Sequence, residues 1–132
     1  MYNILVCDDE KDIVSALEIY LSAEGYQVFT AHSGQEMLDT VAREDIHLVL
    51  LDINLGDGSG FEVCKMLRED TQLPILFISA RQSDDDVLIA LSIGGDDYVK
   101  KPYSLSVLLA KVKVNLKRVD QIRQAQNMTV AE

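Results

Sequence analysis

Four short apolar runs in this chain each stop at a polar or charged residue. The runs occupy residues 4–7, 48–51, 75–78 and 98–99. The residues that follow them are Asp8 and Asp9, Asp52, Ser79, and Lys100 with Lys101. Continuous aliphatic runs of this length are typical of strands that are buried on both faces of a parallel sheet. Because ligands bind beyond the carboxyl ends of such strands, we expect three carboxylates, a hydroxyl and a lysine to meet there.

Segments with helical spacing of apolar residues separate these runs. Helices are predicted at residues 12–24, from a capping box at 33–36 to about 43, at 61–69, at 84–93 and at 105–119, with a further strand at 27–31. Strands that alternate with helices indicate an α/β fold. The sequence therefore predicts a single doubly wound sheet of five parallel strands, with helices on both faces and right-handed crossovers.

The bulk properties limit the class of protein. A length of 132 residues fits one domain. Residues 120–132 carry no apolar stripe, so we expect residues 1–119 to form the domain and residues 120–132 to be a linker or frayed tail. No apolar run approaches the ~18 residues that span a bilayer. The first residues lack signal-peptide features, so we expect a cytoplasmic protein without membrane contact. A net charge of −10 disfavours nucleic acid and favours cations as direct partners.

Three carboxylates brought together in a fold need compensation. Two like charges 4 Å apart repel by about 4 kcal/mol at an effective dielectric constant near 20. A bound cation would remove this cost, and oxygen ligands with room for water suit Mg²⁺. Neither His32 nor His47 is expected at a strand end, which argues against softer metals.

The same set of residues suits phosphoryl transfer. A carboxylate can attack phosphorus and form an acyl phosphate. Asp52 is the best candidate nucleophile because it ends the central strand, while Lys101 and Ser79 could contact the phosphoryl oxygens. An aspartate-nucleophile phosphatase acting on a small molecule is an alternative. Such an enzyme would normally have a second acid two residues after the nucleophile, where this chain has Asn54.

Residues 3–119 resemble the receiver domain of bacterial two-component response regulators. The resemblance rests on Asp8-Asp9-Glu10, on Leu51-Asp52 with Gly60-Phe61-Glu62, on Pro74-Ile75 leading to Ser79-Ala80, and on residues 95–103. It implies the flavodoxin-like sheet order 2-1-3-4-5. It also implies a phosphoacceptor domain that assists its own phosphorylation and dephosphorylation, and not an enzyme in the ordinary sense.

The resemblance assigns roles to individual residues. Asp52 would accept a phosphoryl group from a phosphohistidine of a sensor histidine kinase. Mg²⁺ would be bound by Asp9, Asp52 and the backbone carbonyl of Asn54, and by Asp8 through water. Lys101 would contact the phosphoryl group. Ser79 would move toward that group, and Tyr98 would turn inward in step, which changes the face formed by the last two helices and the last strand.

Residues 95–98 and 108–111 look most like the group of response regulators that carries a winged-helix DNA-binding domain. Members of that group form homodimers on phosphorylation. By position, Asp97 would pair with Lys111 and Asp96 with Arg118 across the dimer, around an apolar patch of Leu88, Leu91 and Ala110. DNA would be bound only through an output domain outside this chain. A stand-alone receiver that acts by protein contact is the alternative.

The chain departs from the pattern of that group at several positions. Val87 and Val107 occupy the places of a usual basic–acidic pair, so an apolar contact could replace an ion pair at the dimer interface. Gly56 stands where a proline is common, which predicts a more mobile loop after Asp52.

Overall fold

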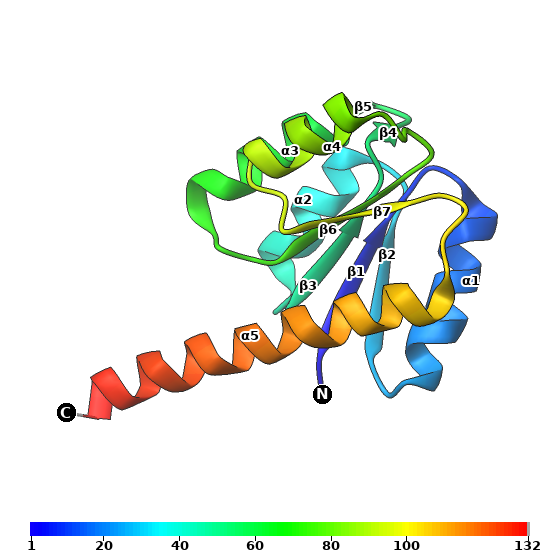
Figure 1. The fold of residues 1–132 in the computed structure, drawn as a ribbon. Helices are drawn as coiled ribbons and strands as arrows, with labels where there is room; N and C mark the ends of the chain where they lie inside the picture. The colour runs from blue at the N-terminus through cyan, green and yellow to red at the C-terminus, as the bar shows by residue number, and fades with distance from the viewer. Residues whose placement is uncertain (132) are drawn as a thin grey trace.

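A parallel sheet lies between two layers of helices (Figure 1). The computed structural model describes the backbone of residues 1–131 and the side chains of residues 1–126. The strands of the sheet are β1 (Asn3–Cys7), β2 (Gln27–Ala31), β3 (Leu48–Leu51), β6 (Ile75–Ser79) and β7 (Asp97–Lys100). The strands β4 (Asn54–Leu55) and β5 (Gly58–Ser59) form a separate hairpin. The helices are α1 (Lys11–Ala23), α2 (Gly34–Arg43), α3 (Gly60–Asp70), α4 (Asp84–Ser92) and α5 (Leu105–Ala131).

The sheet has five strands in the order β2-β1-β3-β6-β7, and every neighbouring pair is parallel. With the small hairpin left out of the numbering, this is the order 2-1-3-4-5. The predicted fold class is therefore confirmed. In this arrangement β1 and β3 are neighbours at the centre of the sheet, so the residues that come after them lie next to each other.

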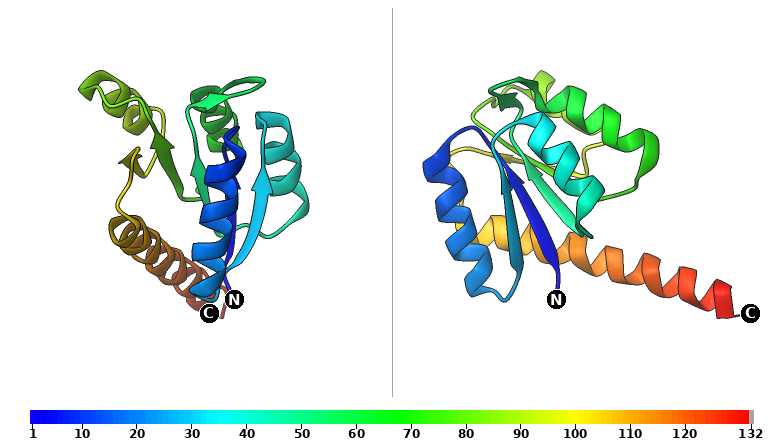
Figure 2. Two further views of the ribbon diagram at one scale, coloured as in Figure 1. Left: turned by 90° about the vertical axis from the view of Figure 1, so that its right-hand side faces the viewer. Right: turned by 180° about the vertical axis from the view of Figure 1, so that it is seen from behind.

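Alternate residues of each strand face opposite layers of helices. Leu5 and Cys7 of β1 pack with α2, α3 and α4, whereas Ile4 and Val6 pack with α1 and α5. Figure 2 shows the two layers from the side and from behind. Burial of both faces explains why the strands appear in the sequence as unbroken apolar runs instead of alternating ones.

The last helix is longer than the sequence predicts. We expected α5 to end near Val119, but the helix continues to Ala131, and this expectation is wrong. Residues 120–131 contain neither glycine nor proline, so nothing in them breaks a helix. Asp120 accepts a hydrogen bond from the hydroxyl of Tyr2, and Arg123 pairs with Asp45, so the extension is fastened to the body. Within the described residues, no helix is both long and apolar enough to cross a membrane.

The loop between β3 and α3 contains the β4–β5 hairpin, and its two ends lie close together. The backbone N–H of Gly60 donates to the carbonyl of Ile53, with an N–O distance of 2.6 Å. A Cβ on Gly60 would lie 2.1 Å from the carbonyl oxygen of Asp52, so no side chain fits there. Gly56 lies at the tip of the same loop, and a Cβ there would meet nothing within 4 Å.

The two glycines should therefore respond differently to the same change. Gly60→Ala is expected to lower the free energy of unfolding by about 3 kcal/mol, because the backbone of Asp52 must shift. Gly56→Ala is expected to leave stability unchanged or to raise it by up to about 1 kcal/mol, because it restricts only the unfolded chain. Urea unfolding followed by circular dichroism measures both. Equal stability of the two variants would contradict the close approach at Gly60.

Candidate functional site

Four strands bring the predicted polar residues to one edge of the sheet. Asp8 and Asp9 follow β1, Asp52 follows β3, Ser79 ends β6, and Lys101 follows β7. The backbone N–H of Asp52 donates to the carbonyl of Cys7 (2.9 Å), and that of Lys101 donates to the carbonyl of Ser79 (2.8 Å). These bonds continue the sheet by one residue past the strands, and they fix where the side chains begin.

The ammonium group of Lys101 lies between the carboxylates of the site. Its Nζ is 2.8 Å from Oδ2 of Asp8, 3.2 Å from Oδ2 of Asp52 and 3.5 Å from Oε1 of Glu10. The side chains of Lys101, Asp8 and Asp52 are 9%, 3% and 4% exposed, so this charge cluster is shielded from water. Burial alone would lower the pKa of Lys101, but hydrogen bonds and charges from Asp8 and Asp52 outweigh it and raise the pKa. Lys101 therefore carries a positive charge at neutral pH.

One lysine does not balance the buried acids. Burial is the largest effect on Asp8, and together with the charge of Asp52 it raises the pKa of the Asp8 carboxyl, although Lys101 and the N–H of Glu10 act in the opposite direction. A raised pKa means that the ionised form of Asp8 is held at a cost in this environment. Two buried carboxylates and one buried ammonium leave an excess of negative charge, which a cation would neutralise.

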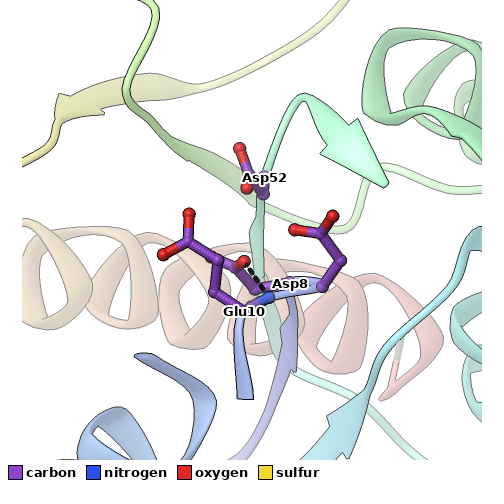
Figure 3. Close-up of side chains that lie close together, drawn as sticks. Asp8, Glu10 and Asp52 are labelled. Atoms are coloured by element: carbon purple, nitrogen blue, oxygen red, sulfur yellow. Dashed lines mark hydrogen bonds between the residues drawn. The ribbon is translucent and has the colours of Figure 1, made fainter. Parts of the chain in front are cut away.

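Four acidic side chains surround a possible metal position. Asp8, Asp9, Glu10 and Asp52 can each supply an oxygen atom, and these atoms lie within 4.8 Å of one another. Figure 3 shows the carboxylates of Asp8 and Glu10 at the end of β1, beside that of Asp52 at the end of β3. Asp8 and Asp52 are buried and Asp9 and Glu10 are exposed, so the cluster is open to solvent on one side. A set of hard oxygen donors with one open side suits Mg²⁺, which keeps several waters when it binds to protein.

Two features of this site were not predicted from the sequence. No role was assigned to Glu10 from the sequence, although Glu10 belongs to the acidic cluster. Its position directly after Asp9 could have indicated this. His32 was expected away from the strand ends, whereas it directly follows β2, and its Nδ1 lies 3.3 Å from the backbone carbonyl of Asp8. That expectation was wrong because only the four apolar runs were considered as strand ends, although the predicted strand at 27–31 ends directly before His32. His32 is not among the residues that could hold the metal.

The remaining predicted site residues lie around the acidic cluster. Asn54 begins β4, and its backbone N–H is 3.4 Å from Oδ1 of Asp52. Ser79 is fully buried, and its Oγ accepts a hydrogen bond from the N–H of Arg81 (3.2 Å). The ring of Tyr98 is buried beside Phe77, and its hydroxyl donates to the carbonyl of Arg81 (2.5 Å). Tyr98 is thus inward in this structure, and its predicted rotation stays a prediction.

The residues expected at a dimer interface form pairs within one chain here. Nζ of Lys111 is 2.9 Å from Oδ1 of Asp97, and Nη2 of Arg118 is 2.6 Å from Oδ1 of Asp96. Asp96 also accepts from Nη2 of Arg68 (2.9 Å) and from the N–H of Ile75 (2.8 Å). Asp96 is therefore a junction between β6, α3 and α5 as well as a surface group.

The expected apolar patch is on the surface. Leu88 and Leu91 are 62% and 44% exposed, and Ala110 is also exposed. Of the two valines that replace a usual ion pair, Val107 is 48% exposed, while Val87 packs partly against the core. Apolar surface is thus available on α4 and α5 without a partner in a single chain.

Replacement of Lys101 should show how much the buried acids depend on it. Lys101→Met is expected to lower the free energy of unfolding by about 3 kcal/mol in the absence of divalent cations, because it leaves two buried carboxylates uncompensated. Added Mg²⁺ should raise the free energy of unfolding of this variant by more than it raises that of the wild type. Lys100→Met, at an exposed position next in the chain, should change stability by less than about 0.5 kcal/mol. Urea unfolding with EDTA or with Mg²⁺ measures all three proteins, and equal losses for the two lysines would contradict the arrangement.

Solved structures of response regulators and their receiver domains are similar to this chain over most of its length. A two-component response regulator from Clostridium difficile is 36% identical, with a TM-score of 0.87 over 89% of this chain and 98% of that chain. The BeF3-activated N-terminal receiver domain of RstA from Klebsiella pneumoniae is 31% identical, with a TM-score of 0.84 over 86% and 97% of the two chains. The receiver domain of the TMAO respiratory system response regulator TorR is 34% identical, with a TM-score of 0.85 over 90% and 99%.

The sequence itself carries the pattern of this family. The family model described as the response regulator receiver domain matches residues 4–113, which include the whole acidic cluster, Ser79 and Lys101. The strand order and the position of the charged edge agree with that match. The chain therefore belongs to the response regulator receiver domain family.

Proposed function

We propose that this chain is a signalling switch of a two-component system that is phosphorylated on Asp52 by a sensor histidine kinase. The observation that carries the proposal is the position of Asp52. Its carboxylate is buried at the end of the central strand, 3.2 Å from Nζ of Lys101 and within the acidic cluster. A nucleophile, a fixed positive charge and a group of metal-binding oxygens are therefore present at one point.

The proposed transfer needs little from the protein beyond positioning. A carboxylate oxygen of Asp52 attacks the phosphorus of a phosphohistidine, a P–O bond forms, and the P–N bond breaks with its electron pair going to the imidazole nitrogen. Mg²⁺, when bound to Asp9, Asp52 and the carbonyl of Asn54, supplies charge neutralisation for the phosphoryl oxygens. Lys101 exchanges part of its contact with Asp8 and Asp52 for a phosphoryl oxygen. Asp8 orients water at the metal position.

The switch depends on a change in what Ser79 can bind. Ser79 ends β6, its Oγ accepts from the N–H of Arg81, and its hydroxyl also interacts with the hydroxyl of Tyr98. An acyl phosphate on Asp52 provides a new acceptor, so it favours the state in which Ser79 is drawn toward it. The carbonyl of Arg81 also accepts from Tyr98, and movement of the segment after β6 therefore changes the contact of Tyr98. The consequence is a rearranged surface on α4, β7 and α5.

The rearranged surface is the proposed homodimer interface, through which a DNA-binding output domain would control transcription. The pairs Lys111–Asp97 and Arg118–Asp96 exist within one chain, so dimerisation would exchange internal partners for those of a second copy. Such an exchange of ion pairs contributes specificity more than affinity. The exposed side chains Leu88, Leu91 and Val107 supply apolar area for affinity.

Two alternatives to this proposal differ from it in the output or in the substrate. A stand-alone receiver would form the same acyl phosphate and use the same surface to contact another protein, without dimerisation. A small-molecule phosphatase is disfavoured by Asn54, which is exposed and offers no second acid two residues after the nucleophile.

Phosphorylation should be specific to one residue and should require a divalent cation. Incubation with Mg²⁺ and acetyl phosphate is expected to add one phosphoryl group, detected by intact-mass spectrometry, because Asp52 is the proposed nucleophile at the end of the central strand. Asp52→Asn should take up none, and Asp70→Asn, at an exposed acid on α3, should behave as the wild type. Uptake by Asp52→Asn, or equal uptake in EDTA, would contradict the assignment.

Dimerisation should depend on the charge at position 111. The wild type with Mg²⁺ and beryllofluoride, an analogue of the acyl phosphate, is expected to form a dimer in sedimentation velocity. Lys111→Glu should weaken the dimer at least about tenfold, because it places like charge against Asp97. Lys113→Glu is the matched control, since Lys113 instead contacts Glu24 at the end of α1. A stand-alone receiver is indicated if the wild type stays monomeric while Asp52 binds the analogue.

A further inference from the structure

A carboxylate in the loop after Asp52 caps a helix that is distant in the sequence. Oδ1 of Asp57 accepts from the backbone N–H of Gly34 (2.8 Å), and Oδ2 accepts from that of Gln35 (3.2 Å). These are the first two residues of α2, more than twenty residues earlier in the chain. The two backbone hydrogen bonds lower the pKa of the Asp57 carboxyl, so it stays ionised at neutral pH. A negative charge at a helix N-terminus is also favoured by the helix dipole.

The start of α2 is arranged to receive this carboxylate. Ser33, the N-cap of α2, uses its hydroxyl only for the third amide, that of Glu36 (3.2 Å). The first two amides are thus left for Asp57. Gly34 allows the first turn of α2 to lie close to α3, because a Cβ there would be 2.8 Å from Cγ2 of Val63, whereas Oδ1 of Asp57 would be at an ordinary contact distance of 3.5 Å.

The loop that carries Asp57 also carries the backbone of the proposed metal site. Asn54 and Leu55 of β4 pair with Ser59 and Gly58 of β5, and residues 56 and 57 form the tip between them. Figure 2 shows this hairpin at the same end of the molecule as the first turn of α2. The base of the loop is held by Gly60, and Asp57 holds the tip. The loop was predicted to be mobile because Gly56 stands where a proline is common. Hydrogen bonds instead hold it at its base and at its tip.

We propose that Asp57 is a positioning residue, whose carboxylate fastens the hairpin to α2 and so holds the carbonyl of Asn54 where it can bind Mg²⁺. This inference rests on the proposed function of the site. It makes α2, which contributes no residue to the acidic cluster, a support for the metal position. Asp57 itself touches neither the metal nor the phosphoryl group.

The test compares Mg²⁺ affinity in three variants of the full chain. Asp57→Asn keeps the shape of the side chain but presents an NH₂ group to one of the two amide donors. It therefore loses one of the two hydrogen bonds that join the loop to α2. Asp39→Asn removes the same charge from an exposed acid of α2, whose carboxylate accepts a hydrogen bond from the Gln35 side chain. Gly34→Ala causes a clash with Val63 that must move either that side chain or the first turn of α2, and movement of the turn shifts the two amides from Asp57 without any change of charge. The dissociation constant for Mg²⁺ is measured by amide chemical-shift titration at a temperature where urea unfolding shows every variant to be folded.

Asp57→Asn is expected to bind Mg²⁺ about tenfold more weakly than the wild type, the size of effect that outer-shell partners of metal ligands have. Gly34→Ala should weaken binding in the same direction, and Asp39→Asn should change the constant by less than about twofold. Wild-type affinity in Asp57→Asn, or an equal loss in Asp39→Asn, would overturn the positioning role while leaving phosphorylation of Asp52 intact. A wild type that binds no Mg²⁺ would overturn the proposed function together with this inference.

Discussion

The contact of one buried lysine with two buried aspartates is the constraint on which the site depends. Lys101 lies 2.8 Å from Asp8 and 3.2 Å from Asp52, and all three side chains are almost fully buried. The three residues come from the ends of β1, β3 and β7, so the contact exists only if the sheet has formed in this order. The buried charge is also unbalanced, because two acids face one base. The fold thus holds a local excess of negative charge at this point, which favours the binding of a cation.

A second set of contacts connects this charged edge with the rest of the molecule. Asp57 joins the loop after Asp52 to α2, and Arg81 accepts from Tyr98 on β7. At the start of β7, Asp96 pairs with Arg118 of α5, and Asp97 pairs with Lys111 of α5. Movement of the segment after β6 would therefore change the contact of Tyr98 directly, and the proposed switch uses this contact. Hydrogen bonds and ion pairs that can exchange partners supply the discrete alternative arrangements that a population shift requires.

The sequence predicts the site better than it predicts the supports of the site. Asp8, Asp52 and Ser79 were expected at this edge because each directly follows an apolar run, and Lys101 follows Lys100 at the end of another; the register of a parallel sheet brings the four strand ends to one edge. The Asp57 clamp and the in-chain partners of Asp96 depend on which distant segments meet, and no periodicity reports that. The extension of α5 was missed because its residues lack an apolar stripe, whereas contacts of Asp120 and Arg123 with the body hold it. Glu10 was missed because it lies one residue after Asp8 and Asp9, the two acids that the pattern marks at the end of β1.

The most direct test of the central claim is anomalous diffraction from a crystal grown with Mn²⁺ in place of Mg²⁺. We expect one strong peak at the carboxyl edge of the sheet, in contact with carboxylate oxygens of Asp9 and Asp52 and the carbonyl of Asn54. A crystal with no peak at that edge, or with its only peak elsewhere on the molecule, would contradict the claim that these acids form a cation site.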